Sequence, residues 1–105
     1  MIIDMRTYTM HPGRLKAYLE LYEKEGLAVQ RSHLGEMIGY FTVEVGPQNQ
    51  VVHMWGYTSM AERETKRAAM EADPAWIAYR KKSGESGNIQ FQENKILKST
   101  SFSPL

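Results

Sequence analysis

The chain has 105 residues, contains no cysteine and carries a formal net charge of +1. This length suits one domain, and 42% hydrophobic against 24% charged residues is typical of a globular fold and not of a disordered chain. Thirteen basic residues are balanced by twelve acidic ones, so the charge does not indicate binding to nucleic acid. The lack of cysteine excludes disulfides, thiolate chemistry and cysteine-ligated metal centres.

The two ends of the chain carry little targeting information. Residues 1–6 lack the basic and then apolar order of a signal peptide, and no apolar run is long enough to cross a bilayer. We therefore expect a cytoplasmic protein without membrane contact, with a single domain over residues 1–105 and a C-terminal tail over residues 99–105. Because Phe102 and Leu105 make this tail apolar, we expect it to dock against the helices of its own chain or of a partner.

The first quarter of the chain predicts a strand followed by a helix. Residues 2–10 are rich in β-branched and aromatic types and contain no Gly or Pro, which favours a strand that ends at residues 11–13, His-Pro-Gly. From Arg14 onwards the apolar residues recur with helical spacing. Gly26 lies on their apolar face, so we expect a kink there or the close approach of another backbone.

Two further strands are predicted over residues 37–45 and 51–58. A cluster of turn-forming residues over 46–50 joins them, and such a pair of β-rich runs is typical of a hairpin.

The last part of the chain predicts two short helices and a strand. Ser59 and Glu62 have the spacing of a capping box, so a helix is expected to begin at Ser59. Asp73 followed by Pro74 predicts the start of another helix, with a stop signal over residues 83–87. Residues 88–98 then form a more polar strand.

The resulting order is β-α-β-β-α-β, with the second helical segment in two parts. This order predicts an α+β, ferredoxin-like fold, in which a four-stranded antiparallel sheet carries its helices on one face. Alternation along the second strand places Met37 and Phe41 on one face and Ile38 and Tyr40 on the other. Because both faces are apolar, a monomer would expose a large hydrophobic patch, and we therefore expect a homodimer.

Short segments along almost the whole chain carry a family resemblance. They are Arg6-Thr7-Tyr8-Thr9 with Pro12-Gly13, Gly39-Tyr40-Phe41-Thr42, Asn49 with Val52-His53-Met54-Trp55, Asp73-Pro74 with Trp76 and Tyr79, and the ending Phe102-Ser103-Pro104-Leu105. In this order they resemble the NIPSNAP family. The resemblance implies a dimeric α/β barrel, a fold shared with antibiotic-biosynthesis-type monooxygenases. The chain departs from the family pattern at Gly56, where a larger side chain is more usual, and this bears on the shape of a pocket near Trp55.

Five side chains are predicted to form one ligand-binding cluster. Arg6 and Tyr8 share a face of the first strand, and His53, Trp55 and Tyr57 share a face of the third, which is its neighbour in this topology. Such a cluster suits a small aromatic or carboxylate ligand, with His53 or Tyr8 as a candidate catalytic residue for proton transfer. The alternative is that Arg6 bridges a glutamate across the dimer while the aromatic residues fill a core.

Other candidate sites are weaker. His11, His33 and His53 are too scattered for a metal site, so we expect no metal and no cofactor, with a haem held by His53 as a minor alternative. Arg63 and Arg67 lie one helical turn apart and could hold an anion. Acidic residues nearby favour a solvated helix face instead.

Two classes of function remain open from the sequence. The first is a small-molecule-binding protein or a cofactor-free enzyme of the oxygenase or isomerase type, which the fold resemblance implies. The second is a non-catalytic homodimeric protein-interaction module. A cavity beside His53 would favour the first class, and a solidly filled face would favour the second.

Overall fold

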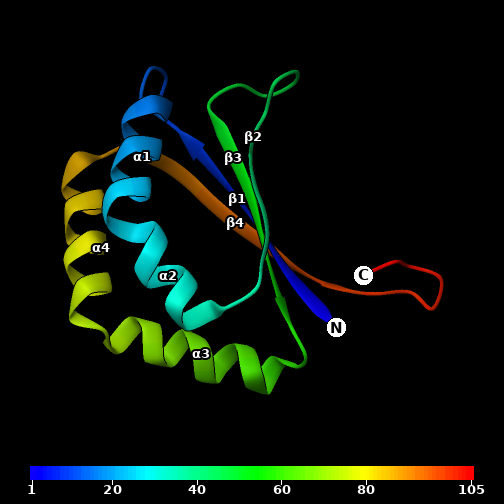
Figure 1. Cartoon of the computed structure of the whole chain (residues 1–105). Helices are drawn as coiled ribbons and strands as arrows, with labels where there is room; N and C mark the ends of the chain where they lie inside the picture. Colours follow the sequence, from blue (N-terminus) through cyan, green and yellow to red (C-terminus); the bar gives the residue numbers. More distant parts are fainter.

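The computed structural model describes all 105 residues. Its four strands are β1 (Ile2–Met10), β2 (Met37–Thr42), β3 (Gln50–Tyr57) and β4 (Ile89–Lys98), which form an antiparallel sheet in the order β2-β3-β1-β4. The helical segments are α1 (Leu15–Leu21), a π-helical turn η1 (Tyr22–Gly26), α2 (Leu27–Leu34), α3 (Met60–Ala72) and α4 (Pro74–Ser86). All of them lie on one side of the sheet (Figure 1). The predicted α+β ferredoxin-like fold is therefore confirmed.

The helical segment after β1 is interrupted by the π-helical turn that ends at Gly26. The backbone N–H of Leu27 donates to the carbonyl of Tyr22, five residues back. A Cβ atom on Gly26 would lie only 2.9 Å from Cδ1 of Tyr22 and 3.0 Å from Cζ of Tyr79. Of the two alternatives expected at Gly26, the helix is irregular there, and the close approach is made by aromatic side chains and not by another backbone.

The hairpin differs from its prediction in length and in alternation. β2 ends at Thr42, so Val43 lies in the connecting loop and not in a strand. A bulge between Met37 and Gly39 inserts one residue into the ladder with β3. Met37 and Tyr40 consequently both pack against the core, because one extra residue reverses the alternation of a strand.

Both predicted helix starts are confirmed. The Ser59 side chain accepts a hydrogen bond from the backbone N–H of Glu62, and α3 follows. The Asp73 side chain accepts one from the N–H of Ala75, with Pro74 as the first residue of α4.

Helix α4 ends within the predicted stop signal over residues 83–87, near its last residue. Ser83 is a helical, buried residue, and the helix runs on to Ser86. It ends at Gly87, whose φ of 63° is the left-handed conformation that terminates many helices. The predicted stop signal therefore contains the end of the helix, but only its last residue, Gly87, terminates α4.

The sheet has one covered and one open face. On the covered face, Val51, Trp55 and Tyr57 of β3 pack against the helices and are at most 2% exposed. The open face carries the opposite side chains of the strands, and its apolar members are Ile3, Met5, Ile38, Phe41, Val52, Met54, Phe91 and Leu97. Phe41 is 51% exposed and Phe91 64% exposed. The apolar second face that the sequence predicts is present, and the homodimer itself stays a prediction.

The C-terminal tail extends from the sheet on the side away from the helices, close to the N-terminus (Figure 1). Phe102 is 87% exposed and Leu105 is 53% exposed. The expectation that the tail docks on the helices of its own chain is therefore wrong, while docking on a partner stays a prediction. No helix is both long and apolar enough to cross a membrane.

Candidate functional site

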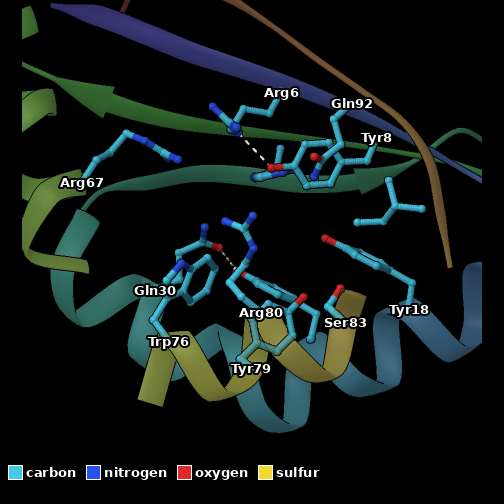
Figure 2. Close-up of a pocket in the computed structure, with 13 residues that line it drawn as sticks. Arg6, Tyr8, Tyr18, Gln30, Arg67, Trp76, Tyr79, Arg80, Ser83 and Gln92 are labelled. Atoms are coloured by element: carbon cyan, nitrogen blue, oxygen red, sulfur yellow. Dashed lines mark hydrogen bonds between the residues drawn. The ribbon is translucent and has the colours of Figure 1, made fainter. Parts of the chain in front are cut away.

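A cavity of about 110 Å³ lies between the covered face of the sheet and the helices (Figure 2). It is lined by Arg6, Tyr8, Tyr18, Tyr22, Gln30, His53, Arg67, Trp76, Tyr79, Arg80, Ser83, Ile89 and Gln92. Three of these residues are arginines and none is acidic. Because a cavity of roughly 150 Å³ holds a benzene molecule, this one suits a more compact chemical group.

The ladder between β1 and β3 places the predicted cluster on the covered face. Arg6 lies directly opposite His53, and the rings of Tyr8 and His53 meet edge to face with their centroids 4.8 Å apart. These three residues line the cavity. Trp55 and Tyr57 follow on the same face of β3, but they are buried in the core beyond the cavity wall. The structure thus brings three of the five predicted residues to one cavity.

A fully buried aspartate, Asp4, holds Arg6 in place. Its Oδ2 atom lies 3.2 Å from Nη1 of Arg6 and 3.0 Å from Nε of Arg63, while Asn94 donates to Oδ1 at 3.0 Å. Burial by itself would raise the pKa of Asp4, but the hydrogen bond from Asn94 and the two guanidinium groups outweigh it and lower the pKa. The partner of Arg6 within this chain is therefore an ionised carboxylate of its own strand.

The two arginines of α3 point inwards, so the prediction of a solvated helix face is wrong. Arg63 donates to Asp4, and Arg67 lines the cavity with only 20% of its side chain exposed. Arg67 and Arg80 lie 3.8 Å and 3.7 Å from the same oxygen of Glu71, beyond hydrogen-bonding distance. The guanidinium groups of Arg6, Arg63, Arg67 and Arg80 thus share the two carboxylates of Asp4 and Glu71, so positive charge is in excess. Figure 2 shows the three of these arginines that line the cavity.

His53 presents an N–H group that has no partner. Trp55 donates its indole N–H to Nδ1 of His53 at 2.8 Å. Burial, together with the nearby guanidinium of Arg6, lowers the pKa of His53 to about 3, so the ring is neutral. Because an indole nitrogen can only donate, Nδ1 is the acceptor and the ring proton lies on Nε2. This Nε2 atom is buried without a hydrogen-bond partner.

A second unpartnered donor lines the same cavity. Trp76 is 5% exposed, and its indole N–H makes no hydrogen bond. Leaving one such buried donor unsatisfied costs about 1–3 kcal/mol. The hydroxyl oxygen of Tyr8 accepts a hydrogen bond from Nε of Arg6 at 2.9 Å, which leaves the Tyr8 proton free to be donated. The cavity therefore offers several donors for an acceptor group that comes from outside the chain.

Two further tyrosines that line the cavity, Tyr18 and Tyr22, have hydrogen-bond partners within the chain. The hydroxyl groups of Tyr18 and Tyr40 are 2.7 Å apart, and Tyr22 donates to Oε1 of Gln30. Burial raises the pKa of Tyr18, of Tyr22 and of Tyr40, so all three stay neutral. The Tyr40 ring also stacks on His53 with centroids 4.5 Å apart, which fixes the plane of the imidazole.

Sequence reasoning missed several residues of the site, although a signal for them exists. Asp4 lies two residues before Arg6, so strand alternation places both on the same face. Trp76, Tyr79, Arg80 and Ser83 follow the i, i+3, i+4, i+7 spacing of one helix face, which is the side of α4 that lines the cavity.

Gly56 and His33 both lie outside this site. A Cβ atom on Gly56 would approach Ile38 at 3.4 Å, which is on the open face, so this glycine does not shape the pocket beside Trp55. His33 pairs with Asp73 at 2.7 Å, and no group of three potential metal ligands is brought together. The cavity beside His53 is too small for a porphyrin.

Comparison with known proteins places this geometry in a family. The sequence model of the NIPSNAP family matches residues 3–104. Protein NipSnap homolog 3B of Mus musculus is 38% identical over 74 residues, which cover 70% of this chain and 29% of that protein. The NipSnap homolog of Dictyostelium discoideum is 31% identical over 94 residues, or 90% of this chain and 40% of its own length. The chain thus spans less than half the length of these curated relatives.

Solved structures agree with this assignment. A NIPSNAP family protein of unknown function from Agrobacterium tumefaciens is 44% identical with a TM-score of 0.92, covering 100% of this chain and 93% of that one. A NIPSNAP-like domain protein from Burkholderia xenovorans is 40% identical with a TM-score of 0.91, and the match covers 99% of this chain and 89% of that one. An antibiotic biosynthesis monooxygenase shares the fold alone. It is 11% identical with a TM-score of 0.63, and the match covers 95% of this chain and 99% of that one.

Proposed function

The chain belongs to the NIPSNAP family, and from the cavity of its domain we propose that it binds a small carboxylic acid between the sheet and the helices. The observation that carries this proposal is that three arginines and no acidic side chain line the cavity, together with His53 and Trp76, each of which has a buried N–H group without a partner. A carboxylate supplies both the negative charge and the acceptor oxygens that such a lining lacks.

The contributions of the lining groups differ. Arg67 and Arg80 make no hydrogen bond to Glu71, so their guanidinium N–H groups are available for an anion. His53 and Trp76 add neutral donors whose cost of burial a ligand would remove. A hydrogen bond to a charged group is worth about 1.5–3 kcal/mol, so a few such contacts suffice for binding a small acid. The size of the cavity favours a compact acid over the aromatic ligand that the sequence left open.

Proton transfer, where the site performs any, rests on Tyr8 in this proposal. His53 has a pKa lowered to about 3 and carries its proton on Nε2, the ring nitrogen that Trp55 does not bond, so it serves as a donor and not as a general base. Tyr8 retains a free hydroxyl proton beside Arg6. The likeness to a monooxygenase at 11% identity concerns the fold and supports no reaction here.

We also propose that the chain acts as a homodimer that packs through the open face. Its apolar side chains lie on the side of the sheet that no helix covers (Figure 1). Contiguous exposed apolar surface of this kind usually marks an interface. The covered face, which contains the cavity, would remain accessible in each subunit of such a dimer.

The two tryptophans offer a direct test of the carboxylate site by NMR. We expect propionate to shift the indole N–H resonance of Trp76, which gains an acceptor, more strongly than that of Trp55, which is already bonded to His53. Propionamide, the neutral isostere, should shift neither resonance. Arg80→Gln should weaken propionate binding about tenfold, which corresponds to about 1.4 kcal/mol. Lys81→Gln removes the same charge one residue along, outside the cavity lining, and should leave binding unchanged.

The same titration weighs the alternative function. If the two indole resonances do not respond to propionate, or respond equally to propionamide, the carboxylate site is refuted. The non-catalytic interaction module would then be the better interpretation, because the cavity would have no ligand of the expected charge.

A further inference from the structure

A second, larger cavity adjoins the first at the outer edge of the domain. Its volume is about 300 Å³, and it lies between the second half of α4 and the beginning of β4. Three of its residues, Gly84, Gly87 and Gln90, belong to it alone. The others line both cavities, and these are Arg80, Ser83, Ile89 and Gln92. Figure 2 shows three of these shared residues, Arg80, Ser83 and Gln92, among the residues of the inner cavity.

The two cavities differ in their chemistry. The inner one is lined by charged and aromatic groups and has room for a compact anion. The outer one contains a single apolar residue, Ile89, and a single charged one, Arg80, which it shares with the inner cavity; otherwise it presents two glutamine amides, a serine hydroxyl and the backbone at two glycines. Amide and backbone groups both donate and accept hydrogen bonds, so they match a neutral polar partner and not an alkyl chain.

We propose that the two cavities form one bipartite site for an elongated acid, whose carboxylate head occupies the inner cavity and whose neutral polar tail lies in the outer one. The inference rests on the proposed carboxylate site and extends it to the class of ligand. Together the two cavities reach the range of roughly 300–1,000 Å³ that is usual for small-molecule pockets, which the inner cavity alone does not. Arg80, at their junction, contacts the head while the amides of Gln90 and Gln92 contact the tail.

Gly84 provides a clean way to close the outer cavity. It is a helical residue of α4, and a Cβ atom added to it would meet nothing within 4 Å. Gly84→Leu therefore fills the outer cavity without touching the inner one, since Gly84 does not line the latter. Gly84→Ala is the matched control, because it makes the same change in the backbone while adding a single carbon.

Three acids separate the head from the tail in the NMR titration. Propionate is the head alone, N-acetyl-β-alanine adds an acetamide tail, and hexanoate has the same chain length with an apolar tail. In the unmodified protein we expect N-acetyl-β-alanine to bind about tenfold more tightly than propionate, and hexanoate to gain much less. Gly84→Leu should reduce the affinity for N-acetyl-β-alanine to that for propionate without changing propionate itself. Gly84→Ala should keep the full difference.

The outcomes distinguish this inference from the proposed function. If propionate and N-acetyl-β-alanine bind the unmodified protein equally, the bipartite site is refuted while the carboxylate site stands. Tighter binding of hexanoate than of N-acetyl-β-alanine refutes the polar nature of the outer cavity. If none of the three acids binds, both proposals fail. These results come from the unmodified chain, so they hold even where Gly84→Leu does not fold.

Discussion

Acidification is expected to destabilise the folded chain through His53. The side chain is 1% exposed, and burial beside Arg6 lowers its pKa from the ordinary value of 6.5 to about 3. Between these two values the unfolded chain binds a proton that the folded chain excludes, so the free energy of unfolding falls as the pH falls. Above the upper value neither state is protonated and His53 contributes no pH dependence.

The size of the effect follows from the two pKa values. When the pH falls from about 7 to about 5, His53 becomes protonated in the unfolded chain but not in the folded one. This difference by itself should lower the free energy of unfolding by about 2 kcal/mol. The carboxylate of Asp4 does not add to this change. Its ordinary pKa is 3.8 and its pKa in the folded chain is lower still, so in both states it titrates at a more acidic pH. The loss should grow further until the pH reaches the pKa of folded His53.

Urea unfolding followed by tryptophan fluorescence measures this loss, with His53→Asn as the reference. Asparagine does not titrate, and its side-chain oxygen still offers an acceptor to the indole of Trp55. We expect the variant to lose most of the pH dependence between about pH 7 and about pH 5, whatever its stability at neutral pH. An identical slope in both proteins would refute the assignment of His53 as a buried, neutral imidazole.

Four further predictions concern packing and assembly. Gly26→Ala should destabilise the chain by about 1–3 kcal/mol, because the new Cβ would clash with two tyrosine rings. Gly84→Ala, with open space around it, should stabilise by up to about 1 kcal/mol in the same urea assay. Light scattering should give about twice the chain mass of 12.1 kDa, and Phe41→Glu on the open face should halve it, since a buried unpaired charge costs several kcal/mol. Ala78→Glu on the exposed side of α4 is the control, and a monomeric unmodified chain would refute the dimer. Deleting residues 99–105 should lower the melting temperature by several degrees if the tail docks on the partner, and an unchanged melting curve would show that it does not.

Local patterns in the sequence were sufficient for the fold. Strand composition, the caps at Ser59 and Asp73 and the order of elements predicted the ferredoxin-like sheet, because each depends on neighbours within a few residues. Strand alternation also put Arg6 and Tyr8 on the same face as each other, and His53 on one face of β3. Only the ladder register between β1 and β3 then decided that Arg6 and His53 stand directly opposite each other.

What depends on distant contacts could be settled only by the tertiary structure. The bulge in β2 moved Met37 to the same face as Tyr40, because the fit of the strand against β3 overrides simple alternation. Arg63 and Arg67 both point inwards, and for Arg63 the cause is Asp4, which lies 59 residues before it and offers a buried carboxylate. In the sequence those arginines have acidic neighbours on their own helix, so a solvated face is the local expectation. The buried carboxylate makes the difference, because a charge removed from water must be paired, and the guanidinium groups are drawn in to pair it.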